Sequence, residues 1–459
     1  MGNMIGVGIF IYPSMIAGHL PHPIWFLLVW IIGGFIALSG ALSSAEIASF
    51  YPEAGGDYAY LRNVYGERWA FLYGFLCFFV TFPGSIALGL TLVVHFQIAS
   101  ILGDWVNYVA FIFPVLGYNF YYYQLIAIAL VILLTVVNHY GIHSSYHFQR
   151  FMTLFPVLFL IGIGGLTGCA VIFQYLFGDK EFALLSNFSR PYSTPGLTSL
   201  ASALVPVYWT FSGWNSPLAM GAEIKEPEKI IPKAMLYGPI IVTLFYLLFA
   251  SVFLAILPYN ELQAGGADPF YSIGKNFIAT FHSEDSIFLK YLPGAISLII
   301  FFVVLGNMNS TMISGSRIYV AMSHDHLFWE KVGQIDPVRH TPITSLWLQS
   351  LWAIVLIIFV NKESHILNFA FIAVILLSIL TISAIFIVRK RESQRHFLFK
   401  AFGYPFTPLL YICFSFLIFA LLIIDYWNKG ETGIIYFAII SIIIGIVAYE
   451  LTLHKKKLK

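Results

Sequence analysis

Twelve apolar stretches fill most of the chain, and their lengths constrain the fold more than any other feature. A transmembrane helix needs about 20 consecutive, mostly apolar residues, and ten of the twelve stretches are long enough. The stretches are 4–18, 24–50, 69–101, 121–140, 151–177, 198–221, 235–257, 291–322, 343–360, 366–388, 405–427 and 433–453. Only 10% of the residues are charged, against about 25% in soluble proteins. We therefore expect an all-α integral membrane protein of about twelve spans.

Charge and cysteine content exclude several other classes of protein. The 24 Lys and Arg residues barely exceed the 22 Asp and Glu residues, so the chain lacks the positive charge of a nucleic-acid binder. Cys77, Cys169 and Cys413 lie far apart in apolar stretches, a pattern of neither a disulfide framework nor a zinc site. No intramembrane nucleophile and base are paired in the sequence, so we expect neither an enzyme nor a bound metal or cofactor.

Basic residues indicate the orientation of the spans. If the stretch 24–50 runs from outside to inside, 18 of the 24 Lys and Arg residues fall on one side. The six on the other side are Lys180, Arg190, Lys275, Lys290, Lys362 and Lys429. Because cytoplasmic loops are rich in Lys and Arg, the C-terminus is predicted to be cytoplasmic, in a plasma (bacterial inner) membrane. The stretch 4–18 is too short for a span and follows no signal peptide, so we expect a preceding half-helix and tail.

Two of the apolar stretches contain helix breakers. GNMIGVGIF (residues 2–10) has three glycines, and YWTFSGWNSP (residues 208–217) has Ser, Gly, Asn and Pro close together. Unpaired backbone groups are costly in a membrane, so such breaks persist only where they are buried in protein or line a polar cavity. Their equivalent positions in two five-span halves predict an inverted repeat with a binding site between the halves. The alternative is that both are packing notches of small residues.

Four segments resemble the signatures of the amino acid/polyamine/organocation superfamily, and within it the L-type amino acid transporters and bacterial exchangers. The segments are NMIGVGIFIYP (3–13), AEIASFYPEAGGDYAYLRNVYG (45–66), FSGWNSPLAMGAEIKEPEKIIPKAM (211–235) and NSTMISGSRIYVAMSHDHL (309–327). The resemblance implies a LeuT-type fold with discontinuous spans 1 and 6. Its ten-helix core, 1–391, would consist of repeats 1–177 and 198–391, followed by two peripheral helices, 405–453, and a basic tail, 454–459.

The resemblance also implies where an amino acid would bind. Backbone N–H groups of Gly6, Val7 and Gly8 would hold its carboxylate, and carbonyl groups of Met4, Ile5, Trp209 and Ser212 its ammonium group. Ile9, Phe211, Gly213 and Asn215 complete the predicted substrate-binding set. Helix termini support this arrangement, because free N–H groups and a positive dipole end attract anions while free carbonyls attract cations.

Selectivity would come from the cavity walls. The resemblance places an aromatic gate at Trp209, with a packing role as the alternative. Asn215 stands where some acid-resistance exchangers of the superfamily have an acidic residue, which argues against a pH sensor at that position. No charged residue falls within a span near either break, so a neutral substrate is expected.

Polar residues elsewhere leave the coupling mechanism open. Ser310 and Thr311 form a possible cation site, although both hydroxyls could instead bond to the preceding helical turn. Many L-type members carry a Lys where this chain has Pro156, so exchange, sodium symport and facilitated diffusion all stay possible. Residues 102–120 contain no cysteine, so no covalent ancillary subunit is implied.

Two further clusters have competing interpretations. Glu46, Glu223 and Arg317 could form a cytoplasmic gate network or be solvated interfacial charges. The histidines at 139, 143 and 147 would need a nearby carboxylate or thiolate to bind a metal.

The sequence thus predicts a membrane transporter of neutral L-amino acids that works by alternating access. The alternatives are a polyamine or other organocation carrier and a non-transporting amino acid sensor.

Overall fold

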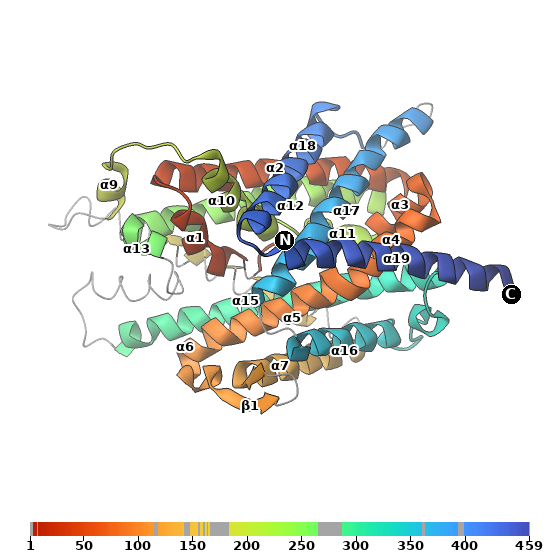
Figure 1. The fold of residues 1–459 in the computed structure, drawn as a ribbon, viewed down its shortest axis with the longest axis horizontal. Helices are drawn as coiled ribbons and strands as arrows, with labels where there is room; N and C mark the ends of the chain where they lie inside the picture. Colours follow the sequence, from red (N-terminus) through yellow and green to blue (C-terminus); the bar gives the residue numbers. More distant parts are fainter. Residues whose placement is uncertain are drawn as a thin grey trace.

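The computed structural model describes most of the chain. The described residues are 3–6, 8–113, 118–141, 147–154, 157–158, 161–162, 164–165, 183–264, 287–359, 363–392 and 399–458. Long helices run roughly along the longest axis, and α17 and α18 are inclined to them (Figure 1). Val7 and Pro156 of the sequence analysis lie outside the described residues.

Helices dominate the described part of the chain. In the first half they are α1 (Gly8–Gly18), α2 (Pro23–Phe50), α3 (Asp57–Tyr65), α4 (Glu67–Leu76), α5 (Phe82–Val93), α6 (Ala99–Leu102), α7 (Tyr122–His139) and α9 (Ala183–Phe188). In the second half they are α10 (Leu197–Thr210), α11 (Ser216–Ala219), α12 (Pro227–Ile256), α13 (Tyr259–Ala264), α15 (Ile287–His324), α16 (Ile343–Phe359), α17 (Glu363–Arg391), α18 (Phe406–Asn428) and α19 (Thr432–Leu458). Short π-helical turns join α4 to α5 and α5 to α6.

Seven helical segments among the described residues are long and apolar enough to cross a membrane. They are Pro23–Phe50, Glu67–Leu102, Tyr122–His139, Pro227–Ile256, Pro293–His324, Phe406–Asn428 and Thr432–Thr452, and α1 and α16 are shorter apolar helices. These helices fall on stretches that the sequence predicts to be apolar spans. Most of the predicted stretch 151–177 lies outside the described residues.

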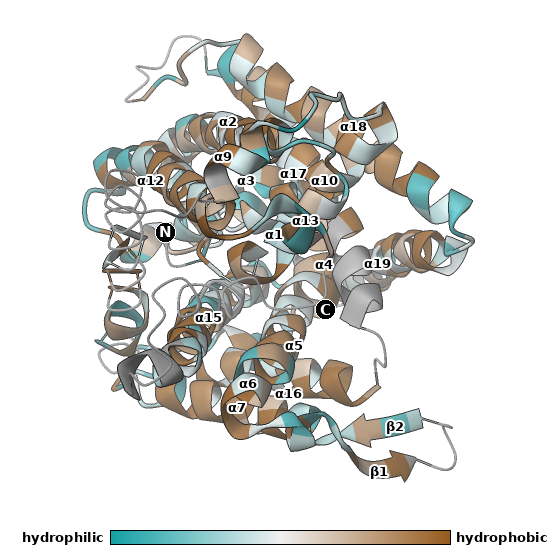
Figure 2. Ribbon diagram, turned by 90° about the vertical axis from the view of Figure 1, so that its left-hand side faces the viewer, coloured by the Kyte–Doolittle hydropathy of each residue, from teal (hydrophilic) through white to brown (hydrophobic). Residues whose placement is uncertain are grey.

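Helices from the two halves of the chain pack in a regular order. α1 contacts α10, α2 contacts α12, α5 contacts α15, and α7 contacts α16. Each contact therefore joins a predicted span of the first half to the span five places later. α1 and α10 lie near the middle of the bundle when it is viewed along its length (Figure 2).

A small β-hairpin follows the helical segment Glu67–Leu102. Strand β1 (Val109–Phe113) pairs antiparallel with β2 (Tyr118–Tyr121), and the rings of Phe111 and Phe120 stack with centroids 4.6 Å apart. The all-α prediction missed this hairpin because its apolar and aromatic residues fall in a segment read only as a loop. β-branched and aromatic residues of this kind favour strands.

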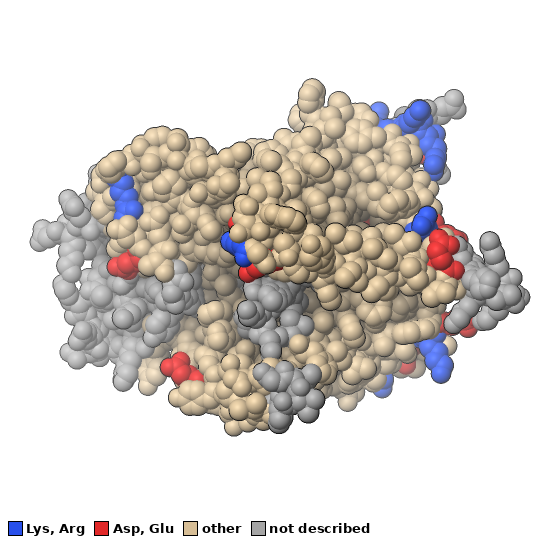
Figure 3. All heavy atoms as spheres, viewed as in Figure 1, with Lys and Arg blue, Asp and Glu red and all other residues tan. Residues whose placement is uncertain are grey.

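The surface has the character expected of a protein in a membrane. Charged side chains on the face in Figure 3 lie at the two ends and in one small cluster between them. Only 22% of the apolar segment of α19 and 28% of that of α18 are buried, compared with 78% for Glu67–Leu102. These two C-terminal helices therefore present most of their apolar side chains to the surroundings.

Glu46, Glu223 and Arg317, for which the sequence left a gate network or solvated charges open, form two separate ion pairs with the participation of Arg389. The guanidinium of Arg317 on α15 pairs with Glu223, with Nε 2.9 Å from Oε1. Glu46 on α2 pairs instead with Arg389 on α17, with Nε 2.6 Å from Oε1. Glu46 is fully buried and also accepts a hydrogen bond from the backbone N–H of Ala401. This pair ties α2 to α17 and to the segment before α18.

We expect Glu46→Gln to lower the stability of the folded protein by about 3 kcal/mol, because it leaves the buried side of Arg389 without a negative partner. Asp425→Asn is the matched control, since it removes the carboxylate of the exposed Lys429–Asp425 pair and is expected to cost about 1 kcal/mol or less. Thermal unfolding of both variants in detergent measures the difference. Equal losses of stability in the two variants would contradict a stabilising role for the buried Glu46–Arg389 pair.

Candidate functional site

The break predicted in span 6 is present and depends on glycine. α10 ends at Thr210, residues 211–215 form turns, and α11 begins at Ser216. Gly213 has a φ of +96°, a conformation that glycine adopts at little cost. A Cβ atom at Gly213 would lie 2.6 Å from the carbonyl oxygen of Asn3. The absence of a side chain therefore lets the two predicted breaks touch.

The segment before α1 is the second non-helical element. Residues 3–6 form turns, and α1 begins at Gly8. A Cβ at Gly6 would lie 2.7 Å from the side chain of Asn307 on α15, and one at Gly8 would lie 2.5 Å from the Thr210 hydroxyl. These glycines are thus required for close packing of the segment against α15 and α10, in addition to any role in binding.

Asn3 connects the two breaks through its side chain and backbone. Its Nδ2 group donates to the hydroxyl of Ser216, and its Oδ1 accepts from Thr311, 2.8 Å away. Its backbone carbonyl accepts from Nδ2 of Asn307 at 2.8 Å. These bonds satisfy polar groups that would otherwise be unpaired where the helices are interrupted. The sequence analysis missed Asn3, although it lies within the quoted NMIGVGIFIYP segment.

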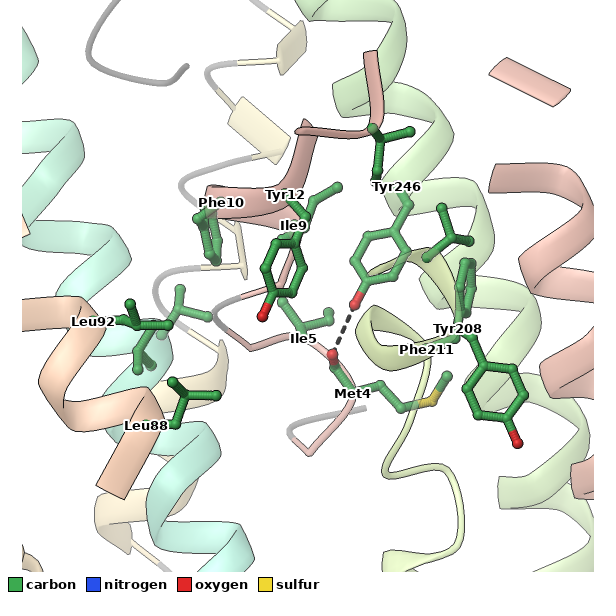
Figure 4. Close-up of a cluster of buried hydrophobic side chains, with 14 of the residues drawn as sticks. Met4, Ile5, Ile9, Phe10, Tyr12, Leu88, Leu92, Tyr208, Phe211 and Tyr246 are labelled. Atoms are coloured by element: carbon green, nitrogen blue, oxygen red, sulfur yellow. Dashed lines mark hydrogen bonds between the residues drawn. The ribbon is translucent and has the colours of Figure 1, made fainter. Parts of the chain in front are cut away.

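The hydroxyl of Tyr246 on α12 lies within hydrogen-bond distance of a backbone carbonyl at each break. It is 2.7 Å from the carbonyl oxygen of Met4 and 3.1 Å from that of Thr210, and Figure 4 shows the bond to Met4. The single hydroxyl proton can serve only one of these carbonyls at a time. Since a carbonyl oxygen has two lone pairs, Met4 keeps acceptor capacity for a substrate.

A cavity of about 140 Å³ lies between the two breaks. Of the predicted site residues, Met4, Gly6, Gly8, Trp209, Ser212, Gly213, Asn215 and Thr311 line it. Residues that the sequence analysis did not assign to the site also contribute, and they include Asn3, Asp57, Tyr73, Ser85, Leu88, Thr210, Asn307 and Met308. The structure therefore brings the non-helical segment before α1 together with side chains from α3, α5, α10 and α15.

Other predicted site residues point elsewhere. Ile5, Ile9 and Phe211 are buried in the hydrophobic core (Figure 4) and do not line the cavity. The ring of Phe211 packs edge to face on Tyr246, with centroids 4.9 Å apart. Ser310 also lies outside the cavity wall. Ile5, Ile9 and Phe211 neighbour the breaks in sequence, but their side chains pack into the core.

Two predicted polar features are already engaged. The Thr311 hydroxyl lies 2.8 Å from Asn3 Oδ1 and 2.9 Å from the carbonyl oxygen of Asn307. Both ring nitrogens of His139 lie within hydrogen-bond distance of donors, on Arg339 and Trp347, so the ring does not offer a free nitrogen to a metal. Within the described ranges no three His, Cys, Asp or Glu residues are grouped to bind a metal ion.

Asp57 brings a carboxyl group to the cavity wall. Its Oδ2 accepts hydrogen bonds from Nδ2 of Asn215 at 2.7 Å and from the hydroxyl of Tyr73 at 3.2 Å. The expectation of a cavity without a charged side chain is therefore wrong. Asp57 lies in the segment 45–66, which the sequence analysis quoted only for its family resemblance, and no local pattern reveals that this segment returns to Asn215.

Burial controls the protonation of Asp57, which lies in α3 between two spans. Burial raises the pKa of Asp57 to about 6, although the hydrogen bonds from Asn215 and Tyr73 act in the opposite direction. Asp57 is the first residue of α3, where a helix N-terminus stabilises a carboxylate by about 0.3–1 kcal/mol. That gain is smaller than the several kcal/mol of desolvation for an ionised group.

Comparison with known proteins identifies the family. Residues 1–448 match the family described as amino acid permease. The chain belongs to this family. It is therefore a multi-pass membrane protein that transports amino acids, and the resemblance found in the sequence is confirmed.

The permease is similar to several characterised transporters. It is 27% identical over 463 residues to the serine/threonine exchanger SteT of Bacillus subtilis, covering 100% of this chain and 95% of that protein. It is 26% identical to the Asc-type amino acid transporter 1 of Mus musculus, over 90% of this chain and 72% of that protein. It is also 25% identical to the human large neutral amino acids transporter small subunit 2, over 75% of this chain and 60% of that protein.

Gly213→Ala should abolish substrate binding by the permease, because its Cβ would push the Asn3 carbonyl away and separate the two breaks. Gly430→Ala is the matched control. Gly430 also has a positive φ, +72°, but a Cβ there would meet no atom within 4 Å. Both variants bear backbone strain of about 1 kcal/mol or more, and only Gly213→Ala alters the site. Thermal-shift titration with amino acids distinguishes them, and intact binding by Gly213→Ala would contradict the geometry.

Proposed function

We propose that the permease carries small neutral L-amino acids by alternating access, with the zwitterion bound between the two helix breaks. The cavity between the breaks is the observation that carries the proposal. Its walls combine Gly6, Gly8 and Ser212 at the two breaks with side chains from several other helices. The N-terminus of α1 suits a carboxylate, and the carbonyls at the end of α10 suit an ammonium group.

Carbonyl groups near Trp209 support the ammonium assignment in part. The Trp209 carbonyl already accepts from the backbone N–H of Ser212 at 2.9 Å and from its hydroxyl at 2.7 Å. Within the described part of the chain, the Ser212 carbonyl accepts no hydrogen bond. We therefore assign the main ammonium contact to Ser212, and we assign Trp209 to the cavity wall, where its ring would cover the substrate.

Cavity size favours a small amino acid. A volume of about 140 Å³ is close to that of an engineered protein cavity of about 150 Å³ that accepts benzene. Serine and threonine are near benzene in size, and tryptophan is much larger. The names of two relatives, a serine/threonine exchanger and an Asc-type amino acid transporter, agree with a small substrate.

Contacts between the halves support a five-plus-five arrangement of the core. A two-fold axis between inverted repeats would place equivalent helices next to each other, as the pairs α1 and α10, α2 and α12, α5 and α15, and α7 and α16 are. α18 and α19 would then be peripheral, with the C-terminal lysines in the cytoplasm.

Uptake into proteoliposomes tests the substrate class. Labelled serine should enter, and unlabelled serine and threonine should compete with it. Their N-acetyl and methyl ester derivatives should not compete, because each lacks one of the two charges that the breaks recognise. Competition by both derivatives would contradict binding of the zwitterion. The alternative function is transport of a cationic substrate, which an ionised Asp57 carboxylate would attract. Strong competition by arginine or putrescine, with none by serine, would select that function.

Met308→Ala should widen the range of substrates. Met308 lines the cavity, whereas Met312, one turn later on α15, is fully buried and does not. Truncation of either side chain costs about 2–5 kcal/mol of stability, but only Met308→Ala enlarges the cavity. Leucine should therefore compete with serine in Met308→Ala and not in Met312→Ala. The same selectivity in both variants would contradict a size limit set by this cavity.

A further inference from the structure

Asp57 is a buried acidic group that the proposed amino acid contacts do not use. Its side chain lines the cavity, and the residue is only 6% exposed. Oδ2 accepts from Asn215 and Tyr73, while the buried Oδ1 has no hydrogen-bond partner among the described residues. One oxygen of the carboxyl is therefore satisfied and the other is not.

No described basic side chain pairs with Asp57. Arg62, on the same helix, pairs with Asp325 of α15 and with Glu53. Arg317 of α15 pairs with Glu223 and Arg389 of α17 pairs with Glu46. Arg391 of α17 donates to the backbone carbonyl of Asn63 on α3. The titratable groups that face Asp57 are the tyrosine hydroxyls of Tyr60 and Tyr73 and the thiol of Cys77.

These surroundings favour the neutral acid while the cavity is shielded from water. An ionised carboxylate without a cation or a full set of donors is costly when buried. A proton on Oδ1 removes that charge and leaves both bonds to Oδ2 in place. The raised pKa of Asp57 agrees with this geometry. When the cavity opens to water, solvation restores the ordinary acidity of the carboxyl.

We propose that Asp57 carries one proton across the membrane together with each amino acid, so that the permease is a proton-coupled symporter. The inference rests on the proposed amino acid transport. An O–H bond forms at Oδ1 with a proton from water on the outer side, and it breaks when the proton passes to cytoplasmic water. No group is oxidised or reduced. Because the zwitterion has no net charge, each cycle moves one positive charge inward.

Proteoliposomes containing the full chain test this coupling. Uptake of labelled serine by the wild type should rise several-fold when the outer pH is lowered from about 7.5 to about 5.5. This range brackets the titration of a carboxyl group whose pKa is raised by burial. Serine addition should also make the outer medium more alkaline. Asp57→Asn should show neither effect. Asp104→Asn is the matched control, since Asp104 lies exposed near the hairpin, and it should behave as the wild type.

Tyr73→Phe provides a second variant that keeps the carboxyl. The hydroxyl of Tyr73 stabilises the ionised form of Asp57, so its loss should move the midpoint of the pH profile to higher pH. A profile that stays in place would overturn the proposal, because a merely structural role of Tyr73 would change the rate without the midpoint.

The outcomes separate the two proposals. Serine uptake that ignores pH in the wild type, or a proton signal that persists in Asp57→Asn, would overturn proton coupling and leave amino acid transport intact. The absence of uptake of any amino acid by the wild type would instead contradict the proposed function. Loss of the pH response in Asp57→Asn, with its retention in Asp104→Asn, is the expected result.

Discussion

The site depends on the need to satisfy backbone polar groups where two helices are interrupted inside an apolar bundle. Each unpaired N–H or C=O group would cost several kcal/mol in a membrane. Side chains from other helices meet this need, since Asn307 donates to the Asn3 carbonyl and Tyr246 to that of Met4 or Thr210. The same bonds hold α1, α10, α12 and α15 around the cavity. The proposed binding of a zwitterion uses backbone groups at the two breaks that these bonds leave free.

Local chemistry made much of this arrangement predictable. The lengths of the apolar stretches located the seven membrane-length helices of the described residues. The clustering of Gly213 with Pro217 located the break in span 6, because these residue types interrupt helices in any context. Which of the residues beside each break line the cavity was less predictable. Ile9 and Phe211 adjoin the breaks in sequence but pack into the core, and position in the sequence alone does not show which way their side chains point. The small hairpin was missed for a similar reason, because loop and strand differ little in so short a segment.

Asp57 shows why the remainder of the site could not be derived from the sequence. It lies 158 positions before Asn215, its hydrogen-bond donor, and follows a loop whose sequence gives no sign of that contact. Only the packing of α3 against α4 and α17 places this loop at the cavity wall. The presence of Asp57 changes the chemistry expected of the cavity, because the sequence predicted walls without a titratable carboxyl group. In our proposal, the size of the substrate is limited by Met308 and its neighbours, and the response to pH comes from Asp57.

A structure of the permease with a bound small amino acid tests the central claim most directly. The account predicts carboxylate oxygens about 2.7–3.2 Å from backbone N–H groups at the start of α1, and the ammonium group at a similar distance from the Ser212 carbonyl. A second, mostly apolar cavity of about 770 Å³ lies between α1, α5, α10 and α18. An amino acid bound there, with the space between the two breaks free of substrate, would contradict the account.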